Sequence, residues 1–295
     1  MQHFNHYWYK SHDGLDLYAR EYPCEGSRGQ NEKTIVCIPG LTRNSADFAV
    51  LSQHLCTCFR VIAVDLRGRG RSAYDQNPSN YQPAVYAEDI ASLLDSLGLA
   101  QVTLIGTSLG GLVSMILNSM QPERVSAVIL NDIGPEPNQA GVERIKFYVG
   151  NRSTVDTWEQ AIEQTRAVLS GEYPNFSDAD WRWFTGNIYR ENKSGKPVLD
   201  YDPAISLPIE QAAFDGVVHA SLWPVFVAMK CIPTLLIRGE LSDIVTQDDV
   251  ARMRAVHPGM EYTQVDCCGH APLLTEPESL LAIDRFLGSR AELLF

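Results

Sequence analysis

The chain has 295 residues, of which 45% are hydrophobic, and a formal net charge of −12 at pH 7. This length and apolar content are typical of one large globular domain, or of a domain with an insertion, built on a sizeable core. The acidic balance argues against nucleic acid as a partner, because binding phosphates needs clustered Lys and Arg side chains.

Cysteine usage and the N-terminal residues indicate the compartment. Seven cysteines at irregular spacings predict no disulfide framework and favour a reduced setting. The first ten residues lack the basic and apolar regions of a signal peptide, and no apolar run approaches the ~20 residues that span a bilayer. We therefore expect a cytoplasmic protein that binds no membrane. The sequence leaves open whether it is a monomer or a homodimer.

Apolar strands alternate with amphipathic helices through the first half of the chain. Two short strands around an Asp-Gly hairpin signal are expected at 7–10 and 15–20. Buried strands are then predicted at 34–38, 60–65, 101–105 and 125–130, with helices between them at 45–55, 83–97 and 109–120. This alternation predicts an α/β fold with a mostly parallel central sheet and helices on both faces.

The alternation stops after Leu130. Up to about Trp223 no buried strand is expected, and aromatic-rich helical stretches occur at 142–149, 157–169 and 178–188. The pattern of strand and helix returns at 234–238, 247–256, 261–265 and 277–287. We interpret 135–225 as a helical cap inserted between the two parts of the core, 1–134 and 226–295.

The segment Gly106-Thr107-Ser108-Leu109-Gly110 lies between a predicted strand and a predicted helix. This is the context of a nucleophile elbow, in which a tight turn lifts the serine hydroxyl above the sheet. Small neighbours relieve crowding across such a turn, and the helix N-terminus adds positive potential beneath it. The pattern predicts Ser108 as a nucleophile.

A serine nucleophile needs a base, and the base needs a carboxylate that fixes its tautomer. Of the seven histidines, His270 follows the last predicted strand, at the edge where catalytic groups of open α/β sheets gather. Asp243 is the leading candidate for the acid, because it follows a predicted strand and gives the chain order Ser, Asp, His. Asp132, which follows the strand at 125–130, and Asp266, close to the base, are alternatives.

Two backbone N–H groups are expected to stabilise the oxyanion of the reaction, one from Leu109 and one from Leu41 in the loop after 34–38. The aromatic residues of the cap indicate an apolar pocket, and its cationic residues are candidates to bind a substrate carboxylate. The candidate substrate contacts are Arg43, Arg144, Phe147 and Trp183. This chemistry needs neither a metal ion nor an organic cofactor.

The segment 65–72 is rich in glycine and arginine. It lacks the Gly-Lys-Ser/Thr ending of a phosphate-binding loop. We therefore predict a structural turn in which Asp65 pairs locally with Arg67.

Together these motifs resemble the α/β-hydrolase superfamily. The resemblance covers nearly the whole chain outside the cap and rests on 39–44, 65–72, the elbow at Ser108, 238–243 and 269–272. Many members have His-Gly in the oxyanion loop, where this chain has Pro39. Bacterial carboxylesterases, enol-lactonases and meta-cleavage-product hydrolases are similar in the same segments.

The resemblance implies a serine hydrolase that cleaves a small-molecule carboxylic ester or lactone through an acyl-enzyme. The alternative activity is hydrolysis of a carbon–carbon bond in a vinylogous diketone by the same triad. A non-catalytic receptor is the third interpretation, and the intact set of Ser, Asp and His argues against it.

Overall fold

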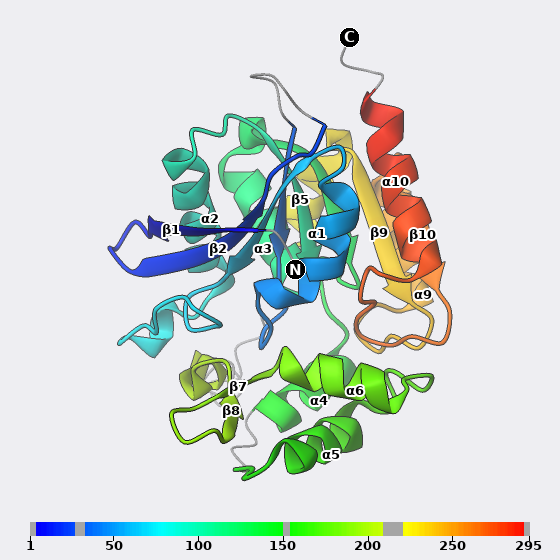
Figure 1. Ribbon diagram of the computed structural model, residues 1–295. Helices are drawn as coiled ribbons and strands as arrows, with labels where there is room; N and C mark the ends of the chain where they lie inside the picture. Colours follow the sequence, from blue (N-terminus) through cyan, green and yellow to red (C-terminus); the bar gives the residue numbers. More distant parts are fainter. Residues whose placement is uncertain (1–3, 27–32, 150–153, 209–220, 292–295) are drawn as a thin grey trace.

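In the computed structural model, which describes residues 4–26, 33–149, 154–208 and 221–291, one large sheet forms the centre of the molecule (Figure 1). Its eight strands lie in the order β1-β2-β4-β3-β5-β6-β9-β10. The six strands from β4 to β10 are parallel, whereas β2 is antiparallel to both β1 and β4. The strands are β1 (Asn5–Lys10), β2 (Asp16–Tyr22), β3 (Thr34–Ile38), β4 (Arg60–Asp65), β5 (Val102–Thr107), β6 (Val125–Asn131), β9 (Thr234–Gly239) and β10 (Glu261–Val265).

Each central strand is buried on both faces, so its side chains alternate between two hydrophobic cores. In β3, Val36 and Ile38 join one core, and Ile35 and Cys37 join the other. The first core is covered by α2 (Pro83–Ser96), α3 (Leu109–Met120), α8 (Trp223–Ala228) and α9 (Gln247–Val256), and the second by α1 (Ala49–Leu55) and α10 (Pro277–Ala291). Covered faces explain why these strands are continuously apolar. The predicted α/β sheet with helices on both faces is confirmed.

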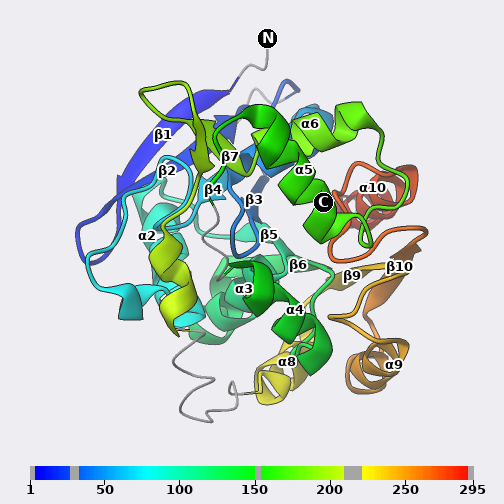
Figure 2. The same cartoon turned by 90° about the horizontal axis from the view of Figure 1, so that it is seen from below.

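Among the described residues between β6 and α8, the helices and a short hairpin lie against the edge of the sheet where the parallel strands end (Figures 1 and 2). We call the described part of residues 135–225 the cap segment. It contains α4 (Gln139–Val149), α5 (Trp158–Leu169), α6 (Asp178–Gly186) and a hairpin of β7 (Tyr189–Glu191) and β8 (Pro197–Leu199). Thr157 caps the N-terminus of α5, and Ser177 with Asp180 forms a capping box on α6, so both helices begin where their sequences supply side-chain acceptors.

Some local structure differs from the sequence prediction. The helix expected at 45–55 begins as a 3-10 turn over Ser45–Phe48, because Asn44 caps it by accepting the N–H of Ala46. The β7–β8 hairpin was not predicted, since three-residue strands are too short to show an alternating pattern. Among the described residues, no helix combines the length and the apolar character needed to cross a membrane.

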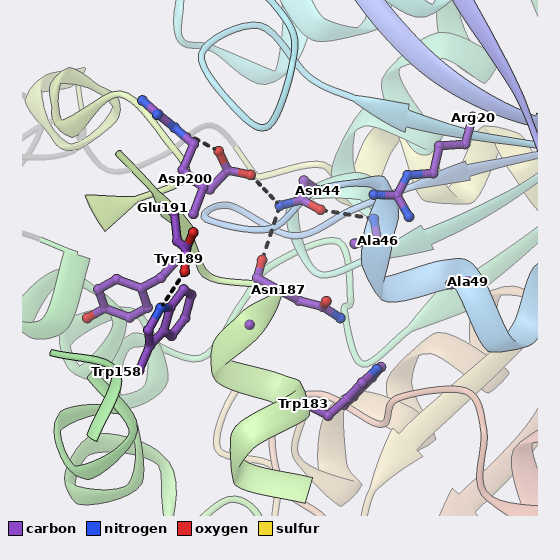
Figure 3. A pocket seen from close by; sticks show the side chains of 12 residues that line it. Arg20, Asn44, Ala46, Ala49, Trp158, Trp183, Asn187, Tyr189, Glu191 and Asp200 are labelled. Atoms are coloured by element: carbon purple, nitrogen blue, oxygen red, sulfur yellow. Dashed lines mark hydrogen bonds and ion pairs between the residues drawn. The ribbon is translucent and has the colours of Figure 1, made fainter. Parts of the chain in front are cut away.

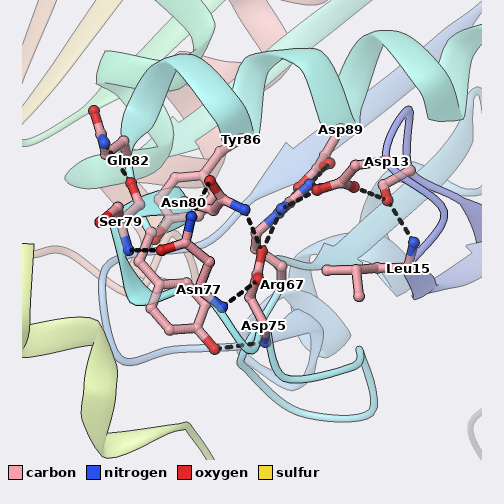
Figure 4. Close-up of polar contacts among 12 residues, drawn as sticks. Asp13, Leu15, Arg67, Asp75, Asn77, Ser79, Asn80, Gln82, Tyr86 and Asp89 are labelled. Carbon is pink, nitrogen blue, oxygen red and sulfur yellow. Dashed lines mark hydrogen bonds and ion pairs between the residues drawn. The ribbon is translucent and has the colours of Figure 1, made fainter.

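A buried arginine fixes the loop after β4. The side chain of Arg67 has no exposed surface, and it donates hydrogen bonds of 2.6–3.0 Å to the carboxylates of Asp13, Asp75 and Asp89 (Figure 4). Asp89 belongs to α2 and is equally buried, so this pair ties the loop to a core helix. A charge removed from water needs such compensation.

The segment 65–72 is a turn, but its predicted ion pair is wrong. Asp65 does not contact Arg67; its carboxylate accepts the backbone N–H groups of Ser45 and Arg71 at 2.7 and 2.8 Å. Burial raises the pKa of Asp65, while these donors act in the opposite direction. Gly70 has a positive φ of 54°, and a Cβ there would collide with this carboxylate.

Replacing Arg67 by Met should lower the free energy of unfolding by about 3–5 kcal/mol, because it leaves buried carboxylates without a counter-charge. Urea denaturation measures this loss. Lys196→Ala is the matched control, since it removes an exposed ion pair with Asp156 and should leave the midpoint nearly unchanged. Similar midpoints for the two variants would contradict the role given to Arg67.

Candidate active site

Ser108 occupies a sharp turn between β5 and α3. Its φ of 52° and ψ of −117° lie in a region that costs energy for any residue with a side chain. Its N–H donates to the carbonyl of Asn131 at the end of β6, at 2.9 Å. A Cβ at Gly106 would collide with the backbone of Gly110, and a Cβ at Gly110 with the carbonyl of Ile38. The two glycines therefore allow the helix to start directly above the strand ends.

The imidazole of His270 lies between Ser108 and Asp132. Its Nε2 is 2.8 Å from Oγ of Ser108, and its Nδ1 is 2.8 Å from Oδ2 of Asp132. The side chain of His270 is 6% exposed and that of Asp132 is fully buried. A hydroxyl, a base and a carboxylate thus form one hydrogen-bonded series, which is the arrangement that activates a serine nucleophile.

The expectation that Asp243 contacts His270 is wrong, because Asp132 holds that place. The carboxylate of Asp243 is turned to the cap segment, where Nε and Nη2 of Arg144 donate to it at 2.6 and 2.7 Å. Burial acts to raise the pKa of Asp243, but the hydrogen bonds and charge of Arg144 outweigh it and hold that pKa below its ordinary value. The alternative acid considered from the sequence, Asp132, occupies the position beside the base.

The last residue of β9 and the loop after it supply hydrogen-bond donors to Asp132. The hydroxyl of Ser242 donates to Oδ2 of Asp132 at 2.6 Å, and the N–H of Gly239 donates to Oδ1 at 3.0 Å. Asp132 has a positive φ of 55°, a conformation that Asp tolerates better than most residues. Its carboxylate therefore has three donors, counting the His270 ring.

The loop after β3 passes close to the nucleophile. A Cβ on Gly40 would lie 3.7 Å from the Cβ of Ser108, and Leu41 lines the same cavity as Ser108. In the described part of the chain, the N–H groups of Leu41 and Leu109 donate no hydrogen bond to another residue. Nε of Arg69 donates to the carbonyl of Leu41 at 2.8 Å, so an arginine from the loop after β4 orders this segment.

A cavity of about 150 Å³ adjoins Ser108 and His270. Arg43, a candidate substrate contact, lines it. Its charge is paired with Asp47 at 2.6 Å, and its guanidinium stacks on the ring of Phe184 at 4.2 Å. The cap segment supplies a largely apolar and aromatic wall. That wall includes Ile145, Tyr148, Val168, Leu169, Tyr173, Phe184 and Tyr201.

The other three candidate substrate contacts do not line this cavity. Arg144 is bound to Asp243, and the side chain of Phe147 is 78% exposed. Trp183 lines a second cavity. These three expectations are corrected, because helix periodicity did not reveal which face of α4 and α6 turns to the sheet.

The second cavity, of about 460 Å³, lies where the β7–β8 hairpin meets the start of α1 (Figure 3). Nδ2 of Asn44 donates to the carbonyl of Asn187 at 3.1 Å and to Asp200 at 3.2 Å. Burial, with the nearby charge of Asp65 adding to it, raises the pKa of Asp200 to about 6. Nε of Arg190 lies 3.2 Å from Oδ1 of Asp200, and its charge partly offsets this rise in the pKa.

Asp200→Asn should raise the free energy of unfolding at pH 8 by about 1–2 kcal/mol. A carboxyl group whose pKa is raised in the folded state stabilises that state below the unfolded pKa, and the stabilisation is lost as pH rises through about 6. The advantage of the variant should therefore disappear near pH 4. Thermal unfolding at both pH values measures it, with the exposed Asp156→Asn as control. A variant less stable than the parent at pH 8 would refute this reasoning.

Three residues that shape the site were not found from the sequence: Arg69, Glu172 and Ser242. Arg69 lies in the segment recognised as a turn, and Ser242 lies beside the expected acid. Their positions in the sequence were therefore the only signal that could have pointed to them. Glu172, which accepts the backbone N–H of His270, belongs to no motif in the cap.

The chain is similar in sequence and in structure to known hydrolases. The model of the family described as alpha/beta hydrolase fold matches residues 33–277. The 3-hydroxybutyrate-oligomer hydrolase of Cupriavidus necator is 30% identical over 87% of this chain and 88% of its own length. The 2-(acetamidomethylene)succinate hydrolase of Mesorhizobium japonicum is 30% identical over 84% and 85%. The crystal structure of an alpha/beta hydrolase from Novosphingobium aromaticivorans is 38% identical, with a TM-score of 0.90 over 98% of this chain and 99% of that one.

Proposed function

Because the chain belongs to the α/β-hydrolase fold family and is a hydrolase, we propose that it cleaves small-molecule carboxylic esters or lactones through an acyl-enzyme on Ser108. One observation supports this above all. His270 lies within 2.8 Å of both the Ser108 hydroxyl and the Asp132 carboxylate. We therefore assign Ser108 as nucleophile, His270 as base and Asp132 as acid.

The steps follow from this geometry. Oγ of Ser108 attacks the ester carbonyl while Nε2 of His270 takes the hydroxyl proton, and Asp132 stabilises the imidazolium through Nδ1. The N–H groups of Leu41 and Leu109 stabilise the tetrahedral oxyanion. His270 then passes its proton to the leaving alkoxide, which departs as the alcohol. Water attacks the acyl group with the same base, and the acid product leaves. The steps call for no metal ion or organic cofactor.

The cavity beside Ser108 favours a short acyl chain. Its volume of about 150 Å³ is below the roughly 300–1,000 Å³ of pockets that hold drug-sized ligands. Among the described residues that line it, the charges of Arg43 and Asp47 neutralise each other. The relative that acts on 3-hydroxybutyrate oligomers makes short 3-hydroxyacid esters the first substrates to test.

The other two interpretations have less support. A cationic cap residue free to bind the substrate carboxylate would favour carbon–carbon hydrolysis, but Arg144 is already bound by Asp243 and lies 3.3 Å from Glu172. A receptor would have no need of a hydroxyl, base and carboxylate in hydrogen-bonded series. We also propose that residues 135–225 act as the cap that selects the substrate, and that the protein works in the cytoplasm.

The protein should hydrolyse 4-nitrophenyl butyrate and the 3-hydroxybutyrate dimer, and 4-nitrophenyl palmitate much more slowly. Ser108→Ala should lower kcat by about 10⁴-fold or more, with the thermal midpoint retained. A fluorophosphonate probe should label the parent and leave this variant unlabelled. Failure of the folded parent to react would refute a serine hydrolase, and turnover of ring-cleavage products alone would favour the carbon–carbon alternative.

Asp132→Asn should lower kcat for 4-nitrophenyl butyrate by about 10⁴-fold, because the asparagine holds the wrong tautomer of His270. Asp243→Asn should cost much less, since its carboxylate contacts Arg144 and not the base. Steady-state kinetics of the two isosteric variants compare them directly. The assignment fails if Asp243→Asn loses more activity than Asp132→Asn.

A further inference from the structure

The main chain around His270 is held by two adjacent residues of the cap segment. The backbone carbonyl of Glu172 accepts the N–H of Gly269 at 2.7 Å, and its carboxylate accepts the N–H of His270 at 2.5 Å. The hydroxyl of Tyr173 donates to the carbonyl of Ala271 at 2.8 Å. Three successive residues of the loop that carries the base are thus fixed by the cap.

Gly269 shows how closely the cap approaches this loop. A Cβ at Gly269 would collide with the carboxylate and the Cα of Glu172. The φ of Gly269 is not in the positive range that favours glycine. The glycine is therefore required by the proximity of Glu172 and not by the conformation of its own backbone.

Glu172 is held in place by a cationic partner. Its side chain is 11% exposed, and burial raises its pKa, while the His270 N–H and Arg144 act to lower it. Nε of Arg144, from α4, lies 3.3 Å from Oε1 of Glu172 and also donates to Asp243. Arg144 therefore joins one cap residue to the loop after β9 and keeps the second oxygen of Glu172 free for His270.

Tyr173 is a rigid anchor. It is buried, its ring stacks on Phe176 with centroids 4.5 Å apart, and it lies edge-on to Trp181 at 6.4 Å. Stacked and edge-to-face aromatic pairs of this kind resist reorientation. The pair Glu172 and Tyr173 thus behaves as one clamp on the loop, with one side chain charged and one aromatic.

We propose that Glu172 is a positioning residue for His270, supplied by the cap segment, so that the base is aligned between Ser108 and Asp132 only while the cap is seated. This inference rests on the proposed function. It gives Arg144 and Asp243, which sequence reasoning placed at the substrate and at the base, a shared role as the brace of Glu172. It also links enclosure of the substrate to assembly of the triad.

The test compares Glu172→Ala with Glu172→Gln, and uses Asp178→Asn as control. Asp178 lies at the start of α6, is 82% exposed and pairs only with Arg166 among the described ion pairs. Glu172→Ala should lower kcat for 4-nitrophenyl butyrate by about 10–100-fold, the cost typical of a misplaced reacting group. KM should change little, because Glu172 does not line the cavity. The rate of Ser108 labelling by a fluorophosphonate should fall in parallel.

Glu172→Gln should recover most of kcat, because its amide oxygen can accept the same N–H of His270. The control should match the parent. A parent-like kcat and labelling rate in Glu172→Ala would overturn the proposal, as would Gln and Ala variants that are equally impaired.

Two further measurements keep the result decisive. If Glu172→Ala does not fold, Tyr173→Phe removes only the hydroxyl that holds Ala271, and should lower kcat by about 2–10-fold; an unchanged kcat there would contradict the clamp. The parent protein separates this inference from the proposed function. A parent that neither labels nor turns over esters refutes the function, whereas an active parent with an unaffected Glu172→Ala refutes the positioning role alone.

Discussion

The rest of the site depends on the hydrogen bonds that the buried carboxylate of Asp132 accepts. It has no exposed surface, and its donors come from separate segments of the chain: the His270 ring, the Ser242 hydroxyl and the Gly239 N–H. A buried carboxylate is tolerated only with such compensation, so this one charge requires the loops after β9 and β10 to converge on the end of β6. The imidazole of His270 links this carboxylate to the hydroxyl of Ser108 through one hydrogen bond on each side of the ring.

The loop after β9 faces two ways and connects the two layers of the protein. Ser242 points inward to Asp132, while the next residue, Asp243, points outward to Arg144 of the cap segment. Because neighbouring side chains of this loop point in opposite directions, one short segment both donates a hydrogen bond to Asp132 and binds the cap segment. The core therefore provides Ser108, His270 and Asp132, and the cap segment contributes hydrogen bonds that hold the loop of His270.

The fold and the tight turn at Ser108 were predictable because their signals are local. Continuous apolar runs reflect strands covered on both faces, and the glycines around Ser108 reflect steric exclusion across one turn. The carboxylate that contacts His270 was harder to predict, because Asp132 and Asp243 both follow strands that end at one edge of the sheet. Only tertiary contacts decide which one turns inward. The cap residues Phe147 and Trp183 were misplaced for a related reason, since an aromatic side chain on a helix does not show which face is covered.

The position of Asp132 limits where the cap segment could be replaced. The chain leaves the sheet at once: Asn131 ends β6, Asp132 carries the carboxylate, and Ile133 packs where a side chain on Gly111 would lie. Asp132 therefore lies only a few residues before the start of the cap segment. A chimaera that grafts another protein's cap onto this core has to be spliced after Ile133, because a junction even two residues earlier would remove the carboxylate together with the native cover.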